Sequence, residues 1–453
     1  MLNINRIAII GGGFSGTLLA LNLLRHDGPG AILIERTPDK LARGVAYSTG
    51  HPVHLLNVRA GNMSAFPDEP GHFVEWLIRN GEGSAGAFVP RAAYGRYLAE
   101  LLADARSRAP GRLEIISGEA VDIDPGVDGA VIRLSDGRTI AAGAAVLAPG
   151  NLPPHDLPAL GSLSASELYL PHGWSPVACQ GLSANDHVLL IGSGLTAIDV
   201  ALSLDAEGFA GRIVALSRRG LHPRSHEEVS AAGPRAAVDK PAAQGAALVR
   251  HVRQRAMTVG WRSAVDELRP YTQDIWRSAD SGERARFLRH LRPYWDIHRH
   301  RLAPQVARRI AAMVEEGRLR FLAGRLLDAR LAGGQAQISW RPRNGAGAEV
   351  LRVRRVVNCT GPQGNLLHSR DRLLRRLTDR GLIRPDDLCL GIDMHHSGRV
   401  IGKDGQASDR IFAIGPMTRG AFWEIVAVPD LRQQSWQLAR WLSRAHWVGG
   451  EGL

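Results

Sequence analysis

Two glycine-rich turns are the parts of this 453-residue chain whose residue types and spacing indicate chemistry most directly. The first turn follows the apolar run Arg6–Ile10, and its candidate ligand contacts are Gly11, Gly13, Phe14, Ser15 and Gly16. Glycine permits a tight turn and lets the backbone approach a pyrophosphate, whose charge the start of the following helix then stabilises. The turn therefore predicts a dinucleotide-binding strand–turn–helix unit.

An acidic residue in the same unit indicates which dinucleotide binds there. Glu35 ends the predicted strand Ala31–Glu35 and stands 19 residues after Gly16, with Arg36 next to it. A carboxylate at this place accepts hydrogen bonds from ribose hydroxyls and repels a 2′-phosphate. Because the unit begins the chain and the strand Ile411–Ile414 is expected to complete it, we assign it to FAD, with Glu35 and Arg36 as candidate contacts.

The second glycine-rich turn ends differently. Its candidate contacts are Gly192, Gly194, Leu195 and Thr196, with Ala197 at the third position of the motif. The strand that follows, Arg212–Ser217, leads into Ser217, Arg218 and Arg219 without an acid. Arginines offer bidentate hydrogen bonds to a 2′-phosphate, so this unit predicts NADPH in preference to NADH. A pair of solvated arginines is the alternative interpretation.

Two strand ends fit a chain that passes between the two dinucleotide sites. Residues 146–150 and 357–362 each end an apolar strand with a small residue and then glycine. Gly150 and Gly361 are therefore candidate cofactor contacts. Cys359, in the second of these segments, is expected to pack within its strand and not to act as a nucleophile.

The long segment from Gly44 to Pro70 carries few helix or strand signals and is the candidate surroundings of the flavin ring. A loop of this length inside a compact domain is usually functional. Asn57 is a candidate catalytic residue, because its amide could hydrogen-bond the flavin or an oxygen adduct of it. Met63, Ser64 and Phe66 are candidates for lining the pocket. Ordinary loop packing is the alternative for each of them.

A histidine- and arginine-rich stretch, residues 292–301, supplies the other catalytic candidates. His298 and Arg301 are three residues apart and share one face of a predicted helix. Two cations facing a cleft would suit urate or the carboxylate of an amino acid. The alternative is a structural helix. No metal site is indicated, and Trp423 and Glu424 are candidates for closing over the flavin, again with packing as the alternative.

The elements that position these residues define an α/β fold with two Rossmann-like dinucleotide-binding domains. The FAD domain is expected to be interrupted by the NAD(P)H domain: residues 1–154, then 155–325 with a helical insertion at about 244–316, then 326–453. The runs 113–117, 120–123, 130–134 and 139–141 predict a small antiparallel sheet.

Composition limits the remaining possibilities. The net charge is +12, but no block of like charges or aromatic-plus-basic motif indicates nucleic acid. No signal peptide is recognised and no apolar run approaches the roughly 20 residues of a membrane span, so we expect a cytoplasmic protein. Three cysteines, far apart in sequence, exclude a disulfide framework and a CxxC disulfide reductase. A homo-oligomer is compatible with the sequence.

The chain resembles the bacterial FAD/NAD(P)-binding flavoproteins that include FAD-dependent urate hydroxylase and L-aspartate N-hydroxylase, and more distantly ornithine and lysine N-hydroxylases. The motifs that carry the resemblance are residues 11–17, 44–49, 54–68, 294–301, 415–416 and 423–432. Many related flavoproteins keep an aspartate in the C-terminal glycine loop for the ribityl chain. Here Pro416 follows Gly415, so the resemblance implies that backbone amides of 415–421 make that contact.

The resemblance implies FAD and NADPH (or NADH) as cofactors, with a small-molecule substrate and molecular oxygen as reactants. The expected reaction is hydroxylation of a small polar nitrogen-containing substrate, such as urate, an amino acid or an amine, through a flavin hydroperoxide. Two alternatives stay open. One is a flavin-dependent NAD(P)H oxidoreductase with an imine, quinone or other non-oxygen acceptor, and the other is a nucleotide-binding protein without turnover.

Overall fold

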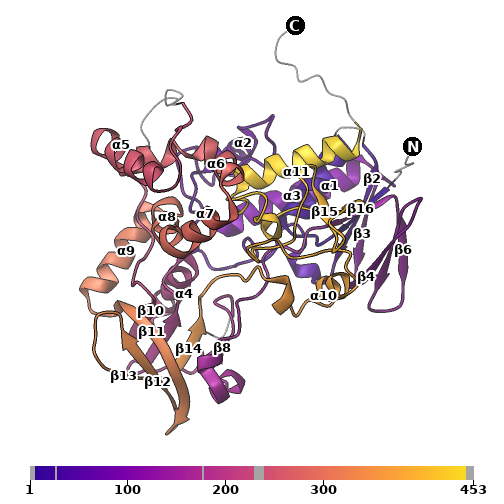
Figure 1. Ribbon diagram of the computed structural model, residues 1–453. Coiled ribbons are helices and arrows are strands. Elements are labelled where there is room, and N and C mark those ends of the chain that lie inside the picture. The colour runs from indigo at the N-terminus through magenta and orange to yellow at the C-terminus, as the bar shows by residue number, and fades with distance from the viewer. Residues whose placement is uncertain (1–5, 26–27, 176–177, 229–238, 445–453) are drawn as a thin grey trace.

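The computed structural model describes residues 6–25, 28–175, 178–228 and 239–444, and two mainly parallel sheets organise them (Figure 1). The first sheet has the order β15-β16-β7-β1-β2-β3, in which β15 is antiparallel to its neighbour and all other pairs are parallel. Its strands are β1 (Arg6–Ile10), β2 (Gly30–Glu35), β3 (Leu113–Ser117), β7 (Ala144–Leu147), β15 (Arg399–Ile401) and β16 (Ala407–Ala413). The first and last parts of the chain therefore share one sheet, as the sequence predicts.

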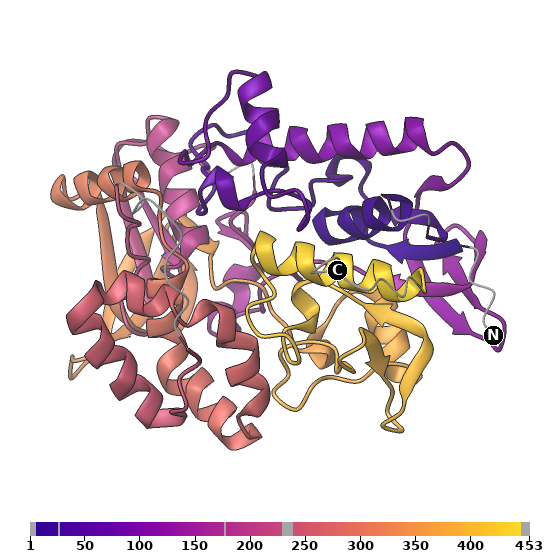
Figure 2. The ribbon, with the colours of Figure 1, turned by 90° about the horizontal axis from the view of Figure 1, so that it is seen from above.

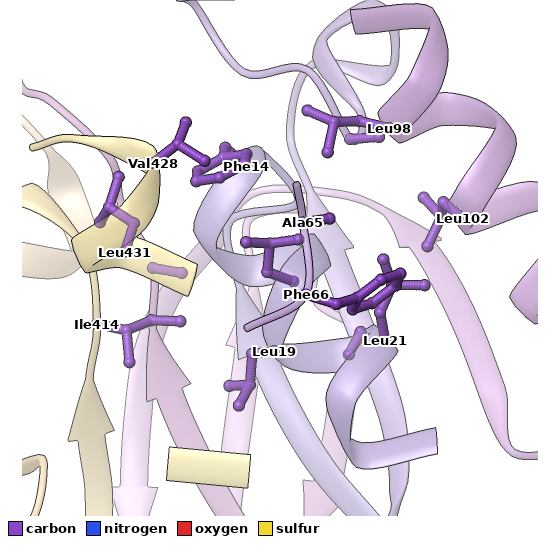
Figure 3. Close-up of a cluster of buried hydrophobic side chains, with 14 of the residues drawn as sticks. Phe14, Leu19, Leu21, Ala65, Phe66, Leu98, Leu102, Ile414, Val428 and Leu431 are labelled. Carbon is purple, nitrogen blue, oxygen red and sulfur yellow. The ribbon is translucent and has the colours of Figure 1, made fainter. Parts of the chain in front are cut away.

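Alternation along the strands gives this sheet two buried faces. Ile7 and Ile9 face helices α1 (Phe14–Arg25), α3 (Arg91–Arg108) and α11 (Val428–Leu442), whose apolar side chains form the cluster in Figure 3. Ala8 faces the small antiparallel sheet and α10 (Arg372–Asp379). Figure 2 shows α11 lying beside α1, so the end of the chain covers the helix that follows the first turn.

The small sheet differs in one strand from the prediction. It consists of β4 (Ala120–Pro125), β5 (Ala130–Leu134) and β6 (Thr139–Ala142). Leu113–Ser117 is instead β3, which pairs in parallel with β2. The prediction was wrong for this strand because a short half-buried strand looks alike in either sheet, and its pairing partner decides where it belongs.

The second sheet has the order β13-β12-β11-β10-β9-β14-β8. Its strands are β8 (Tyr169–Leu170), β9 (His187–Ile191), β10 (Arg212–Ser217), β11 (Leu319–Ala332), β12 (Gln335–Pro342), β13 (Glu349–Val353) and β14 (Arg355–Asn358). The first residues of β11 pair in parallel with β10, and the rest of β11 forms an antiparallel meander with β12 and β13. Helices α4 (Leu195–Ala206) and α9 (Pro304–Glu315) cover one face.

The second sheet continues to Asn358, so the predicted domain boundary at residue 325 is too early. The prediction assigned β12 and β13 to the first domain, because an alternating pattern carries no information about which sheet a strand joins. The α/β class with two Rossmann-like units is confirmed.

The remaining helices lie outside the two sheets. Helix α2 (His72–Arg79) follows the long loop, and α5 (Gly245–Asp266), α6 (Thr272–Ser278), α7 (Ser281–Arg286) and α8 (Arg292–Arg299) form the predicted helical insertion. Short helical turns are η1 (Pro38–Lys40), η2 (Ala60–Asn62), η3 (Pro158–Ala165), η4 (Arg269–Tyr271), η5 (Phe287–Leu291), η6 (Leu366–His368) and η7 (Pro416–Thr418). Among the described residues, none of these helices combines the length and the apolar character needed to cross a lipid bilayer.

Candidate functional site

The first glycine turn requires glycine at its two outer positions. Gly11 has φ +107°, and a Cβ there would lie 2.2 Å from the carbonyl oxygen of Ala148. A Cβ on Gly16 would lie 2.0 Å from the Gly11 carbonyl oxygen. Gly13 faces Gly44 closely, so the beginning of the long loop lies directly against the turn. Phe14 and Ser15 open α1 and are buried.

Glu35 braces this turn from the end of β2. Its carboxylate accepts hydrogen bonds from the amides of Gly12 and Thr37, each at 2.8 Å. A carboxylate has about four acceptor positions, so it can still accept ribose hydroxyls. Its neighbour Arg36 is exposed and forms an ion pair of 3.0 Å with Asp371, the N-cap of α10. The predicted contacts of Glu35 and Arg36 with FAD stay predictions.

The C-terminal glycine loop meets the first turn, as the resemblance implies. Gly415 has φ +90°, and a Cβ on it would lie 3.0 Å from Ser15 Oγ. The Gly415 amide, however, donates to Gln434 Oε1 at 2.8 Å, and Gln434 Nε2 donates to Thr418 Oγ1 at 2.9 Å. The loop is thus fixed by α11, and any ribityl contact must use amides after Gly415.

The second turn combines one crowded glycine with one open glycine. Gly192 has φ +115°, and a Cβ on it would lie 2.3 Å from the Cys359 carbonyl oxygen. A Cβ on Gly194 would meet no heavy atom within 4 Å. Leu195 and Thr196 begin α4 directly after it. Gly194 therefore offers a bare backbone at a helix N-terminus, which is what a pyrophosphate requires.

The two crossing segments lie together where the domains meet. Leu152 and Gln363 form an isolated antiparallel bridge just after Gly150 and Gly361. Both glycines have positive φ, +69° and +87°, and the space beside each is open. The structure thus brings the two segments side by side, as expected for a chain passing between two dinucleotide sites.

The end of β10 separates the two predicted arginines. Ser217 Oγ accepts hydrogen bonds from Ser193 Oγ (2.8 Å) and the Gly220 amide (3.0 Å), which ties the strand end to the second turn. Arg218 is exposed, and its side chain makes no hydrogen bond or ion pair with the described residues. The Arg219 guanidinium instead donates to the carbonyls of Arg289 and His290 within η5, each at 3.2 Å.

The long loop places Asn57 differently from the other candidates. Asn57 is half-buried, and its side-chain amide makes no hydrogen bond with the described residues. Its backbone carbonyl accepts a hydrogen bond of 3.0 Å from His226 Nε2. Burial lowers the pKa of His226 to about 4, so this imidazole is neutral at pH 7. His226 is a residue that sequence reasoning missed, because nothing in its neighbourhood marks it.

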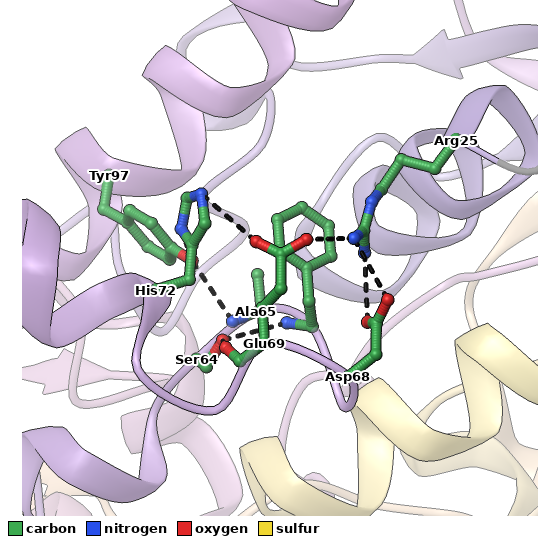
Figure 4. A network of polar contacts seen from close by, with 8 residues as sticks. Arg25, Ser64, Ala65, Asp68, Glu69, His72 and Tyr97 are labelled. Carbon is green, nitrogen blue, oxygen red and sulfur yellow. Dashed lines mark hydrogen bonds and ion pairs between the residues drawn. The ribbon is translucent and has the colours of Figure 1, made fainter. Parts of the chain in front are cut away.

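Met63, Ser64 and Phe66 do not line an open pocket. Their exposed fractions are 2%, 0% and 5%. Ser64 Oγ donates to the Glu69 carbonyl at 2.6 Å, within the polar network of Figure 4. The lining role expected for these three residues is therefore wrong, and the alternative of loop packing accounts for them.

Helix α8 ends at Arg299, so His298 and Arg301 do not share a helix face as predicted, but both side chains pack on Trp261 of α5. Arg301 is 4% exposed, and its guanidinium donates to both carboxylate oxygens of Asp266 at 2.9 and 3.1 Å. His298 Nδ1 donates to the Tyr294 carbonyl at 2.7 Å, and its ring packs on Trp261. The prediction that both cations face a cleft is wrong for Arg301, which is neutralised inside the insertion.

The other face of α8 meets the terminal loop instead. Glu424 is 6% exposed and adopts φ +67°, which is strained for a residue other than glycine. Trp295 Nε1 donates to Glu424 Oε1 at 2.8 Å, and Arg299 Nε lies 3.1 Å from Glu424 Oε2. The sequence did not indicate this contact, because helix periodicity shows which residues share a face but not which face is inward.

More charged residues surround Glu424 between the insertion and the terminal loop. Burial raises the pKa values of Asp296 and Asp430 and lowers the pKa of Arg269. Trp276 strengthens this junction, since its Nε1 donates to the Gly420 carbonyl at 2.8 Å and its ring stacks on Trp423 at 4.5 Å. The terminal loop is thus clamped to the insertion, and Glu424 contacts α8.

A cavity of about 250 Å³ opens beside this clamp. The side chains Arg277 and Arg284 line it from the insertion, and Asp387 and Phe422 line it from the first domain. Among the described residues, no group of three or more histidine, cysteine or acidic side chains could hold a metal ion.

Comparisons with known proteins agree with this architecture. Residues 8–152 match the model of a family described as FAD-NAD(P)-binding. A search of curated proteins found no match. The match over the first unit agrees with the predicted class of cofactor.

Solved structures share the fold over nearly the whole chain. L-lysine 6-monooxygenase from Pseudomonas syringae is 17% identical, covers 98% of this chain and 100% of its own, and has a TM-score of 0.67. Ornithine hydroxylase from Pseudomonas aeruginosa is 16% identical, with 97% and 99% covered and a TM-score of 0.67. The FAD-bound cadaverine monooxygenase of the desferrioxamine pathway from Erwinia amylovora is 13% identical, with 98% and 95% covered and a TM-score of 0.69.

At these identities the likeness establishes the fold alone, a chain of two Rossmann-like α/β domains. The expected distant resemblance to ornithine and lysine N-hydroxylases is confirmed at that level. The resemblance to urate hydroxylase and L-aspartate N-hydroxylase stays a prediction.

Proposed function

We propose that this protein is an FAD-dependent, NAD(P)H-consuming monooxygenase that hydroxylates a small nitrogen-containing substrate, an amine or an amino acid. The observation that carries the proposal is the pair of glycine turns with opposite endings. Glu35 follows the first turn, and the acid-free end at Ser217 follows the second. Three structures of the same fold are described as amine or amino-acid hydroxylases and monooxygenases.

The residues present fit both cofactors. The first turn and Glu35 would hold the pyrophosphate and ribose of FAD, and Gly194 leaves the open backbone that a second dinucleotide needs. FAD, once reduced by the nicotinamide, supplies the electrons that activate oxygen. The role of the protein is to position the substrate and exclude water.

Two parts of the chain are suited to positioning the substrate and excluding water. Asn57 presents an amide without a partner among the described residues, at the edge between the two domains. The clamp of Trp276, Trp295 and Glu424 closes the helical insertion onto the loop that follows Gly415. Urate stays a candidate substrate from the sequence resemblance, while the shared fold favours amines and amino acids.

Electron transfer to a non-oxygen acceptor is the alternative, and thiol chemistry is the least suited form of it. Cys179, Cys359 and Cys389 are all free. Burial raises the pKa of Cys179 to about 12 and raises that of Cys359 strongly, so neither forms the thiolate that disulfide exchange requires. A nucleotide-binding protein without turnover is the third possibility, and spectroscopy separates it from both enzymes.

The deciding experiment follows the flavin and oxygen together. Purified protein should be yellow, NADPH should bleach it, and oxygen consumption should rise when a panel of amino acids, diamines or urate supplies the substrate. Bleaching without substrate-stimulated oxygen consumption would favour the non-oxygen acceptor. A colourless protein that FAD does not reconstitute would exclude both enzymatic interpretations.

A further inference from the structure

We infer that three arginines of the β11–β12 hairpin, Arg325, Arg341 and Arg343, together with Arg218, bind the 2′-phosphate of an NADP-type coenzyme. The inference deepens the proposed function, because it assigns the coenzyme's phosphate to residues outside the glycine motif. It also replaces Arg219, whose guanidinium is engaged by carbonyls of the helical insertion.

The first observation is a like-charge pair across two strands. Arg325 of β11 is the direct register partner of Arg341 of β12, and both side chains are exposed. Side chains at directly opposed positions lie within about 5.5 Å at Cβ, where like charges destabilise a sheet. Arg343, two residues after Arg341, extends the same face of the hairpin and is also exposed.

The second observation is that no acid neutralises this group. None of the three hairpin arginines, nor Arg218, forms an ion pair with a described carboxylate. Asp328, the next acid along β11, forms no ion pair with a described residue either. By contrast, Arg309 and Arg318 of the same domain both pair with Asp205. Four uncompensated guanidinium groups favour an anion from solution.

The third observation places the group at the coenzyme end of the sheet. Ser217, which is hydrogen-bonded to Ser193 of the second turn, is the register partner of Ala323 on β11. Arg325 is two residues beyond Ala323 and so lies on the same face of the sheet as Ser217. The register shift in β11 comes only after Leu326, so this alternation is undisturbed.

Hydrogen bonds connect the hairpin to the end of β10 itself. The Arg343 amide donates to the Ala323 carbonyl at 2.8 Å, and Arg343 Nη1 donates to the Arg218 carbonyl at 3.4 Å. Ligands of doubly wound sheets bind beyond the carboxyl ends of the strands, and the adenosine ribose lies at the end of the second strand. Here that strand is β10, which lies beside β11 in the sheet (Figure 1), so the 2′-position of the ribose would face these arginines.

The chemistry of the group selects among dinucleotides. A ribose diol needs an acceptor such as a carboxylate, and this strand end has none. A phosphate monoester matches the planar, paired donors of guanidinium groups. The geometry therefore assigns NADP(H), and not NAD(H), to the second domain.

The test measures coenzyme binding directly on the FAD-loaded protein, by calorimetric titration with NADP⁺ and NAD⁺. Replacing Arg325, Arg341 and Arg343 together by glutamine should weaken NADP⁺ binding at least 30-fold and change the affinity for NAD⁺ less than threefold. Arg218→Gln should weaken NADP⁺ at least fivefold. The matched control is Arg330→Gln on the same hairpin, where Arg330 already bonds Gln337, and it should leave both affinities unchanged.

If the triple variant bound NADP⁺ and NAD⁺ equally more weakly, or bound NADP⁺ as tightly as the wild type, the assignment would be overturned while the proposed function stands. A wild-type protein that binds NAD⁺ as tightly as NADP⁺ would overturn it as well. The three single variants at these exposed positions repeat the comparison if the triple variant does not fold. Failure of the proposed function would show itself separately, as absence of substrate-stimulated oxygen consumption in a protein that still binds NADP⁺.

Discussion

At the scale of single residues, the two glycines of the second turn separate folding from ligand binding. Gly192→Ala should lower the free energy of unfolding by roughly 2–4 kcal/mol, because its φ is +115° and the new Cβ would lie 2.3 Å from the Cys359 carbonyl oxygen. Gly194→Ala should cost under about 1 kcal/mol, since its φ is −83° and the space beside it is open. The same methyl group would obstruct a pyrophosphate.

Urea unfolding and NADP⁺ titration of the two variants check this contrast. Gly194→Ala should keep its FAD and unfold like the wild type, yet bind NADP⁺ at least about tenfold more weakly, a difference of about 1.4 kcal/mol. Unchanged NADP⁺ affinity in Gly194→Ala would show that the second turn does not hold the pyrophosphate.

Residue types and spacing predicted the two turns well, because glycine at Gly11, Gly16 and Gly192 is imposed by local backbone geometry that any chain of this fold must satisfy. They did not predict which side chains face the site. Arg219 and Arg301 carry the charges that the motif suggested, but tertiary contacts with η5 and Asp266 occupy them.

At the scale of elements, the contact between α8 and the terminal loop depends on one buried acid. Glu424→Ala removes the acceptor for Trp295 and leaves Arg299, whose side chain is 11% exposed, without its ion-pair partner. Breaking a buried pair in this way typically costs about 3–5 kcal/mol. We expect the insertion to loosen before the sheets unfold, with faster amide hydrogen exchange in α6 and α8.

A matched control lies in the same insertion. Asp274→Asn removes the exposed pair of Asp274 with Arg277, whose side chains are 47% and 53% exposed, and should cost under about 1 kcal/mol. Glu424→Gln keeps an oxygen acceptor for Trp295, so its cost in stability should fall between those of the other two variants. If the amide hydrogens of α6 and α8 exchanged equally fast in Glu424→Ala and Asp274→Asn, the clamp would not be what holds the insertion.

Helices and strands were predicted more reliably than the sheets to which the strands belong. The predicted boundary at residue 325 assigned β12 and β13 to the first domain, yet both strands belong to the second sheet. Alternation sets which residues of a strand are buried, while sheet membership is decided by long-range pairing. The hairpin arginines illustrate the consequence, because only the register of β11 against β10 and β12 brings them beside the end of β10.

At the scale of the whole molecule, two histidines link the domains, His54 buried and His226 half-buried. In the long loop, His54 Nε2 lies 2.8 Å from Ser203 Oγ on α4. From the second domain, His226 Nε2 donates a hydrogen bond to the Asn57 carbonyl. Burial lowers both pKa values, that of His226 to about 4. Nothing in the sequence around either histidine indicates this, since their environment is created by the meeting of the domains.

The sign of the resulting pH dependence follows from linkage. The unfolded chain protonates these imidazoles near pH 6.5, whereas the folded protein holds His226 neutral down to about pH 4. The stability they contribute is therefore present above pH 6.5 and is lost as the pH falls from 6.5 towards 4. Between pH 7.5 and 5.5, His226 alone should lower the free energy of unfolding by about 1 kcal/mol.

Urea unfolding at pH 7.5 and 5.5 tests this dependence on the intact protein. His226→Gln keeps an amide N–H for the Asn57 carbonyl and cannot titrate, so the loss between the two pH values should shrink by about 1 kcal/mol relative to the wild type. His396→Gln, at an exposed position, should not change the loss. If His226→Gln lost as much stability as the wild type between the two pH values, the pKa of His226 would be the same in the folded and unfolded states, and its burial would not be a source of the pH dependence.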